Sequence, residues 1–363
     1  MGDPFVKHPR PDWEQFRRVV QGQAEPRRVH LMEMGIDVEV MQAISQQALG
    51  RAWAPLTDDT VEAYCLQVMD LYHRLGYDFV NAPRIIRGHP TERWAAAADT
   101  ATYSRGQRRW VTQQGGLITS WEEFEAFPWG QVRLETDHLE FMARRLPDGM
   151  KLVVTGLSLF EWTMERLLGP ERLFYLLYDQ PDLVRAVFDR WGAKVYECYQ
   201  ATVGMEGVGA ILHPDDLGHK TSTTISLKHL QELVFPWHKK YAALAHAHSK
   251  LFWHHCCGSL YPHAIEVMMD DVGIDGLHSF QDVILPAAEF KARYGQRVAA
   301  LGGVDMDKLV RLDEASLRAY VREILAACMP GGRFALGSGN TIANYVPLGS
   351  YFAMLDEARR WTA

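Results

Sequence analysis

The segment Phe252-Trp-His-His-Cys-Cys-Gly258 places imidazole and thiol groups at the end of an apolar run. Side chains alternate along a strand, so His255 and Cys257 are expected on one face, and His254 and Cys256 on the other. An imidazole and a thiolate two residues apart form half of a tetrahedral zinc site. A satisfied core histidine beside a buried cysteine is the alternative interpretation. The metal interpretation therefore depends on ligands from elsewhere in the chain.

Two carboxylates are candidates for catalytic residues. Glu33, flanked by Met32 and Met34, lies at the end of the apolar run Val29–Met34, where burial would raise its pKa and suit it to acid–base catalysis or metal binding. Asp216 follows another apolar run and could bind a metal, exchange protons or bind a cationic group. The structural alternatives are a paired buried carboxylate for Glu33, and a turn with a helix cap for the doublet Asp215-Asp216.

Other polar groups follow apolar runs in the same way. His278 with Asp282 could form an oriented imidazole pair, which makes His278 the third predicted catalytic residue. Ser338 and Asn340 could hydrogen-bond a substrate carboxylate or phosphate, although Asn340 could instead cap the next helix. The predicted substrate-binding residues are Asn81, His213, Asp282, Ser338, Asn340 and Tyr345.

The apolar runs alternate with longer amphipathic stretches, a pattern typical of repeated strand–helix units. Eight strands with interleaved helices predict an α/β fold, a closed (β/α)₈ TIM barrel, with an open doubly wound sheet as the second choice. No Gly-x-Gly-x-x-Gly follows the first run, which disfavours a dinucleotide-binding sheet. Catalytic groups of such a barrel lie at the C-terminal ends of its strands, where the candidate residues fall. The predicted strands are Val29–Met34, Tyr77–Asn81, Leu152–Gly156, Gly209–His213, Leu251–Cys256, Gly273–Leu277, Arg297–Leu301 and Arg333–Leu336.

Residues 1–363 are predicted to form one domain, with an N-terminal extension and an insertion, residues 84–150, that follows the second strand and covers one barrel end. The net charge of −7 without a basic block disfavours nucleic acid and anionic membranes as partners. No apolar stretch approaches the length of a transmembrane helix. Five cysteines, two of them adjacent, do not suggest a disulfide framework, so a cytoplasmic location is expected.

The ordered set of motifs resembles the uroporphyrinogen decarboxylase superfamily, which includes cobalamin-linked methyltransferases beside the porphyrin enzyme. The resemblance covers roughly residues 27–362 and implies a (β/α)₈ barrel with its site at the C-terminal face. The decarboxylase binds its acidic porphyrin through an arginine-rich N-terminal segment, and residues 28–37 lack the matching arginine pair, so the methyltransferase branch is closer. The landmarks are Arg28-Val-His-Leu-Met-Glu33, Leu75-Gly-Tyr-Asp78, Asp215-Asp-Leu-Gly218, His255-Cys-Cys-Gly258, Gly302-Gly-Val-Asp305 and Gly337-Ser-Gly-Asn340, followed by Tyr345 and Pro347.

The methyltransferase branch implies that His255 and Cys257 bind zinc. Its third protein ligand is a cysteine after the eighth strand, where this chain has Ser338, and a neutral hydroxyl is a poor zinc ligand. We expect Glu33 as the third ligand, with Asp216 and His278 as the other candidates. The changed ligand set could instead suit a methyl ether or methylated amine rather than a thiol. In a metal-free site, the imidazole and the thiol would act in binding or acid–base catalysis.

The resemblance implies a methyltransferase that moves a methyl group between a small methylated substrate and a corrinoid. The corrinoid (a cobamide) is expected on a separate partner protein, because the chain has no evident cobalamin-binding domain. One alternative is a metal-independent decarboxylase or related lyase for a carboxylated aromatic or pyrrolic substrate, in which Asp216 stabilises a protonated intermediate and His278 donates a proton. The other is a non-catalytic corrinoid- or tetrapyrrole-binding protein. A homodimer would be ordinary for the superfamily.

Overall fold

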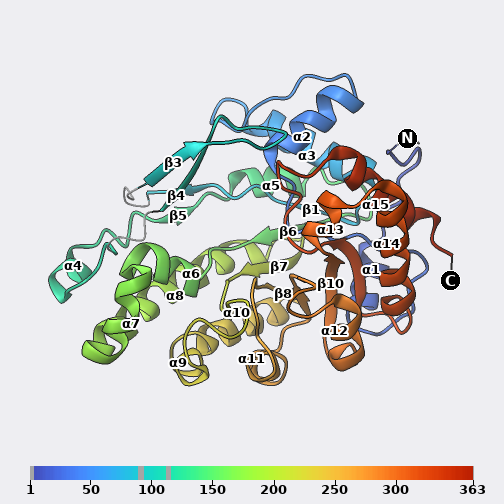
Figure 1. Ribbon diagram of the computed structural model, residues 1–363. Helices are drawn as coiled ribbons and strands as arrows, with labels where there is room; N and C mark the ends of the chain where they lie inside the picture. Colours follow the sequence, from blue (N-terminus) through green and yellow to red (C-terminus); the bar gives the residue numbers. More distant parts are fainter. Residues whose placement is uncertain (1–3, 89–93, 112–115, 363) are drawn as a thin grey trace.

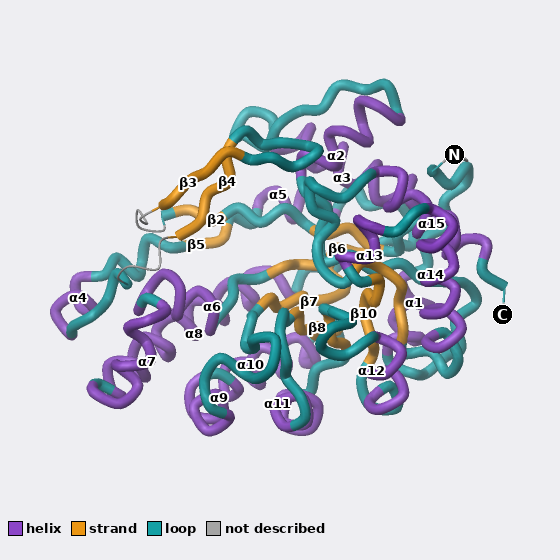
Figure 2. The backbone as a smooth tube through the Cα atoms, in the orientation of Figure 1, coloured by secondary structure: helices purple, strands orange, loops and turns teal. Residues whose placement is uncertain are grey.

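The computed structural model describes residues 4–88, 94–111 and 116–362. Its central feature is a curled sheet of seven parallel strands in the order β1-β6-β7-β8-β9-β10-β11 (Figures 1 and 2). Each strand corresponds to one of the predicted strands, which confirms an α/β fold with a parallel sheet. The strands are β1 Phe79–Asn81, β6 Lys151–Thr155, β7 Val208–Pro214, β8 Leu251–His255, β9 Gly276–His278, β10 Ala299–Val304 and β11 Phe334–Ser338.

The predicted closed barrel of eight strands is only partly confirmed, because Val29–Met34 does not form a regular strand. This segment contributes one isolated parallel bridge, between Leu31 and Leu336. Met32 N–H donates to Leu336 O at 2.8 Å, and Leu336 N–H donates to His30 O at 2.9 Å. The segment therefore lies beside β11, but within the described residues no ladder joins it to β1. The sheet is a curled half-barrel and not a closed ring.

Amphipathic helices cover the outer side of the curled sheet. Helix α3 packs against β1, α8 against β7, α10 against β8, and both α12 and α14 against β10 (Figure 1). The helices are α1 Trp13–Val20, α2 Val38–Ala43, α3 Val61–Leu75, α4 Trp121–Ala126, α5 Asp137–Ala143, α6 Phe160–Trp162, α7 Pro170–Asp179, α8 Pro181–Val203, α9 Leu227–Leu233, α10 Phe235–Ala247, α11 His263–Val267, α12 Ala287–Tyr294, α13 Met306–Arg311, α14 Glu314–Cys328 and α15 Leu348–Arg360. In the described part of the chain, π-helical turns are Ile44–Ala48, Thr163–Leu168 and Met268–Val272.

Apolar side chains pack on both sides of the sheet: the outer core lies between the sheet and the helices, and the inner core fills the inner side of the curl. Helix α1, from the N-terminal extension, inserts Trp13 and Phe16 into the inner core. The Phe16 ring stacks on Phe79 of β1 at 5.7 Å and meets Trp253 of β8 edge-on at 5.8 Å. A Cβ on Gly209, near the start of β7, would touch Trp13. Helix α1 therefore plugs the amino-terminal end of the curl and leaves the carboxyl-terminal end for polar side chains.

The predicted insertion lies between β1 and β6, and its residues 89–93 and 112–115 fall outside the described part of the chain. It forms two small antiparallel pairs: β2 with β5, and β3 with β4. It contacts the loop after β11, where Asn344 Nδ2 donates to Asp99 Oδ2 at 2.7 Å. The insertion therefore reaches the carboxyl-terminal side of the sheet. The strands are β2 Ile86–Arg87, β3 Trp94–Ala98, β4 Gln107–Val111 and β5 Arg133–Leu134.

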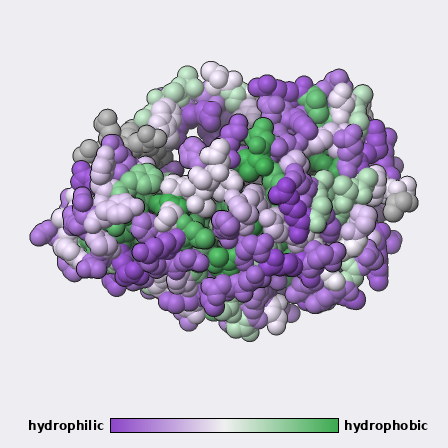
Figure 3. Space-filling model, turned by 60° about the horizontal axis from the view of Figure 1, so that its bottom comes forward, coloured by the Kyte–Doolittle hydropathy of each residue, from purple (hydrophilic) through white to green (hydrophobic). Residues whose placement is uncertain are grey.

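The surface matches the sequence composition. On the face shown in Figure 3, hydrophilic side chains dominate the margins and hydrophobic ones are visible nearer the centre. No helix in the described ranges combines the length and the apolar character needed to cross a bilayer.

Candidate metal centre

The carboxyl ends of β7 and β8 bring together three candidate metal ligands. Asp216 follows β7, His255 is the last residue of β8, and Cys257 lies in the turn after it. Their ligand atoms all lie within 4.8 Å of one another. His255 Nε2 is 3.6 Å from Cys257 Sγ and 3.7 Å from Asp216 Oδ1. Zinc with bonds of about 2.0–2.3 Å places tetrahedral ligand atoms about 3.3–3.6 Å apart, so this donor set fits a zinc ion after small movements.

A chain of hydrogen bonds determines which nitrogen of His255 faces this cluster. His278 Nε2 lies 3.1 Å from the carbonyl oxygen of Ser338, which can only accept, so Nε2 carries the His278 proton. Burial also lowers the pKa of His278, so this ring is neutral, and its Nδ1, 2.7 Å from His255 Nδ1, is the acceptor. Burial lowers the pKa of His255 to about 4, so its ring is neutral. His255 therefore carries its proton on Nδ1 and presents a lone pair on Nε2, as a metal ligand must.

Asn340 holds the sulfur of Cys257 in place. Its Nδ2 donates to Cys257 Sγ at 3.1 Å, and its Oδ1 accepts the N–H of Thr341 at 2.8 Å, which fixes the orientation of the amide. The Cys257 N–H donates to Asp216 Oδ1 at 2.6 Å and ties two ligands together. Burial raises the pKa of Cys257 to about 12, so the side chain is a thiol unless a cation lies beside it.

The turns after β7 and β8 contact each other through two glycines. Gly258 has φ +89°, and a Cβ at this position would lie 2.3 Å from the carbonyl group of Gly218. A Cβ on Gly218 would lie 2.7 Å from the carbonyl oxygen of Ser259. Only residues without a side chain allow the two turns to approach so closely. This approach places Asp216 opposite Cys257.

Glu33, expected as the third ligand, is not part of the cluster, and Asp216 takes that place. Glu33 is fully buried, and its carboxyl group contacts the N–H and the hydroxyl of Ser338. Ser338 Oγ also contacts the carbonyl oxygen of Asn340, which can only accept. A hydroxyl has one proton, so Ser338 donates to Asn340 and accepts from a protonated Glu33. Burial, which raises the pKa of Glu33 to about 8, agrees with this assignment.

The expected pairing of His278 with Asp282 is wrong. The Asp282 carboxylate accepts a hydrogen bond from Tyr320 at 2.9 Å and pairs with Lys308 at 2.7 Å. Lys308 lies on α13 and Tyr320 on α14, the two helices that follow β10, and together they bind this carboxylate. Both ring nitrogens of His278 have other partners. His278 is oriented by the carbonyl oxygen of Ser338 instead.

Among the described residues, three predicted substrate-binding residues make no hydrogen bond to Asp216, His255 or Cys257. His213 faces the helix layer, where Tyr199 OH lies 2.8 Å from its Nδ1. Asn81 Nδ2 donates to the carbonyl oxygen of Glu33 at 2.7 Å. Tyr345 is 42% exposed in the loop after β11. Their roles in substrate binding stay predictions.

Glu161 is a titratable group that the sequence places near a strand end but that was not predicted as a site residue. Its N–H donates to Asp215 Oδ1 at 2.9 Å, at the start of α6. Burial, and then the charges of Asp216 and Asp215, raise the pKa of Glu161 to about 7. A carboxyl group in this range is suited to proton exchange at neutral pH. Its position after the third predicted strand, Leu152–Gly156, was the feature of the sequence that could have identified it as a site residue.

The chain matches no protein-family model and no curated protein sequence. Among solved structures, it is similar to a methyltransferase from Methanosarcina mazei, with a TM-score of 0.64 and 15% identity, over 96% of this chain and 98% of that chain. It is also similar to a Listeria monocytogenes protein assigned as a vitamin-B12-independent methionine synthase, with a TM-score of 0.49 and 13% identity, over 93% and 97% of the two chains. The first likeness shows that this chain shares its fold with that methyltransferase.

Proposed function

We propose that this protein is a zinc-assisted methyltransferase that moves a methyl group between a small methylated substrate and a corrinoid carried by a partner protein. The main support is the convergence of Asp216, His255 and Cys257 at the carboxyl ends of two neighbouring strands. The fold shared with the Methanosarcina mazei methyltransferase is consistent with this activity. Corrinoid binding rests on the resemblance in sequence motifs.

The residues of the centre have separate roles. His255 and Asp216 provide a nitrogen and an oxygen ligand, and Cys257 provides the sulfur. Three protein ligands leave one tetrahedral position for substrate. A bound zinc ion would keep the sulfur deprotonated despite its burial and would polarise the substrate heteroatom. His278 orients the imidazole from behind, and Asn340 supports the sulfur.

The ligand set favours an oxygen- or nitrogen-bound methyl group. A carboxylate in place of a second thiolate makes the centre harder, and hard centres prefer oxygen and nitrogen donors. In the transfer, the bond between the heteroatom and the methyl carbon breaks, and a carbon–cobalt bond forms with the reduced Co(I) corrinoid. The electron pair of the broken bond stays on the heteroatom, which takes up a proton. Methyl ethers and methylated amines are therefore the proposed substrate class.

The test uses free cob(I)alamin as the probe, with a panel of methylated amines and methyl aryl ethers, and follows methylcobalamin formation. We expect turnover with at least one donor, lost at least about 100-fold in Cys257→Ala and Asp216→Asn. Cys198→Ala is the matched control, because Cys198 is also buried but lies on α8. It is expected to keep full activity.

Three outcomes would overturn the proposal. Zinc-depleted protein that turns over at the rate of zinc-loaded protein would exclude the metal centre. Release of carbon dioxide from a carboxylated aromatic or pyrrolic compound without a corrinoid would favour the lyase. Tight binding of a tetrapyrrole without turnover of any donor would favour the binding protein.

A further inference from the structure

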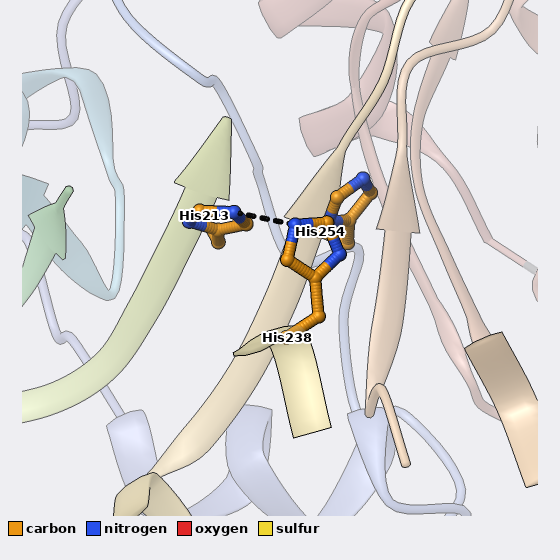
Figure 4. Close-up of side chains that lie close together, drawn as sticks. All are labelled: His213, His238 and His254. Atoms are coloured by element: carbon orange, nitrogen blue, oxygen red, sulfur yellow. Dashed lines mark hydrogen bonds between the residues drawn. The ribbon is translucent and has the colours of Figure 1, made fainter. Parts of the chain in front are cut away.

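Three histidines converge in a second cluster on the opposite side of the sheet from the candidate metal centre. His213 comes from β7, His254 from β8 and His238 from α10, and the three rings point toward one another (Figure 4). Each side chain is 0% exposed. One nitrogen from each ring lies within 4.8 Å of the others. His213 Nε2 and His238 Nε2 are 3.1 Å apart, close to the spacing of two nitrogens on one tetrahedral zinc.

Strand alternation separates this cluster from the candidate metal centre. Trp253 points into the inner core, and His255 lies on the same side of β8 two residues later. Phe252 belongs to the outer core against the helices, and His254 shares its side. The second cluster is therefore buried between the sheet and α10. A site of this kind, made only of protein ligands, is typical of structural metals.

The hydrogen bonds of the cluster do not satisfy its nitrogens. Both ring nitrogens of His254, and Nδ1 of His238, have no hydrogen-bond partner among the residues that the structure describes. Leaving such a buried group unpaired costs about 1–3 kcal/mol. A metal ion would accept a lone pair from His254 and so relieve part of this cost.

The hydrogen bonds available to His238 Nε2 also favour a cation at this site. His238 Nε2 lies 2.9 Å from Asp215 Oδ2 and 3.1 Å from His213 Nε2. If His238 Nε2 carries a proton, that proton can point to only one of these two atoms. If it carries none, its lone pair faces the carboxylate. A cation between the three atoms attracts all of them at once.

Asp215 supplies a negative charge at the right place. It is fully buried, and its Oδ2 is 3.6 Å from His213 Nε2 and 2.9 Å from His238 Nε2. The same carboxylate accepts the N–H groups of Phe160 and Glu161 at 2.9 Å each, so its position is fixed by the start of α6. Three neutral imidazoles and one carboxylate are a donor set that suits a divalent transition metal.

We propose that His213, His238 and His254, with Asp215 as the fourth group, bind a structural divalent metal ion, with zinc as the test ion. The ion would join β7, β8 and α10 behind the candidate metal centre. This site does not depend on the proposed methyltransferase activity, because none of its ligands belongs to the candidate metal centre.

The experiment combines metal analysis with X-ray absorption of the Cys257→Ala variant, in which the second site is untouched. After dialysis against zinc and then buffer, the wild-type chain should hold two zinc ions and Cys257→Ala one. The zinc in Cys257→Ala should show nitrogen and oxygen neighbours, with imidazole scattering and no sulfur. His238→Ala should lose one zinc, whereas the control His248→Ala, at the exposed end of α10, should lose none.

The outcomes separate the two sites. Cys257→Ala protein without zinc, or with zinc bound to sulfur, would overturn the second site even if His238→Ala fails to fold. A wild-type chain with one zinc ion that survives in Cys257→Ala and is lost in His238→Ala would support the second site and contradict the candidate metal centre.

Discussion

The line of residues behind His255 explains why a histidine at a strand end can act as a metal ligand. A protonated Glu33 donates to Ser338, the carbonyl oxygen of Ser338 accepts from His278, and His278 Nδ1 accepts from His255. Each step has one consistent donor and acceptor, so the lone pair of His255 Nε2 is directed to the cluster. Ser338 therefore links Glu33 to His278, because its hydroxyl contacts Glu33 and its carbonyl oxygen accepts from His278. It does not act as a metal ligand.

The first prediction concerns the orientation of the ligand. His278→Ala removes the acceptor for His255 Nδ1 and frees the imidazole to rotate or change tautomer. We expect zinc at the candidate metal centre to bind about 10–100-fold more weakly, measured by competition with a chromophoric chelator in a His238→Ala background. His246→Ala, which removes a histidine that is 43% exposed and paired with Asp275, is the control. Equal affinity in the two variants would refute the positioning role.

The second prediction concerns Glu33 and pH. The unfolded carboxyl group titrates near 4.5 and the folded one near 8, so between these values the folded chain holds the extra proton. Stability from this group is therefore complete below pH 4.5 and falls as pH rises to 8, by at most about 1.4 kcal/mol per pH unit. Relative to wild type, Glu33→Gln should gain stability steadily from pH 5 to pH 8 in chemical denaturation.

The control for this measurement is Glu323→Gln, because Glu323 is exposed on α14. Its stability difference from wild type should stay flat over the same range. A flat difference for Glu33→Gln as well would mean that Glu33 is already ionised at pH 5 in the folded chain, against the proton assignment at Ser338.

At the scale of elements, two of the three candidate ligands, Asp216 and Cys257, lie in the turns after β7 and β8, and the third, His255, is the last residue of β8. Strand alternation predicted the separation of His254 from His255 correctly, because it depends only on local backbone geometry. The third ligand could not be chosen from the sequence, because Glu33, Asp216 and His278 all lie at or just after the end of an apolar run. The choice is made by the contact of Gly218 with Gly258, which is a contact between distant segments.

The third prediction tests this contact. Gly258→Ala combines a positive φ with a clash against the Gly218 carbonyl group, whereas Gly331→Ala has φ +77° and open space around the added Cβ. We expect Gly331→Ala to lose about 1 kcal/mol of unfolding free energy from backbone strain alone. Gly258→Ala should lose more and should also weaken zinc binding, because the clash displaces Cys257. Similar losses in both variants, with zinc binding intact, would show that the close approach is unimportant.

At the scale of the whole molecule, the sequence pattern predicted seven strands of the parallel sheet and the end at which polar groups gather. It did not predict the irregular backbone of Val29–Met34, since the run is apolar enough for a strand. There, a single bridge at Leu31 replaces a ladder. It also did not predict the plug made by α1, whose apolar face gives no indication of which end of the sheet it fills.

The fourth prediction follows from this plug. Phe16 is 0% exposed and stacks inside the curl, so Phe16→Ala leaves a cavity and should lower the unfolding free energy by about 3–5 kcal/mol. Phe174→Ala is the matched control, since Phe174 is 44% exposed on α7 and should change stability by less than about 0.5 kcal/mol. Chemical denaturation measures both. A loss below about 1 kcal/mol for Phe16→Ala would contradict the role of α1 as a packed plug.

The central claim, a zinc centre on Asp216, His255 and Cys257, is tested most directly by a crystallographic anomalous difference map at the zinc absorption edge. We predict a peak about 2.0–2.4 Å from Cys257 Sγ, His255 Nε2 and an Asp216 oxygen in zinc-treated crystals. A map without a peak at bonding distance from Cys257, or with Glu33 as the third ligand, would contradict the account.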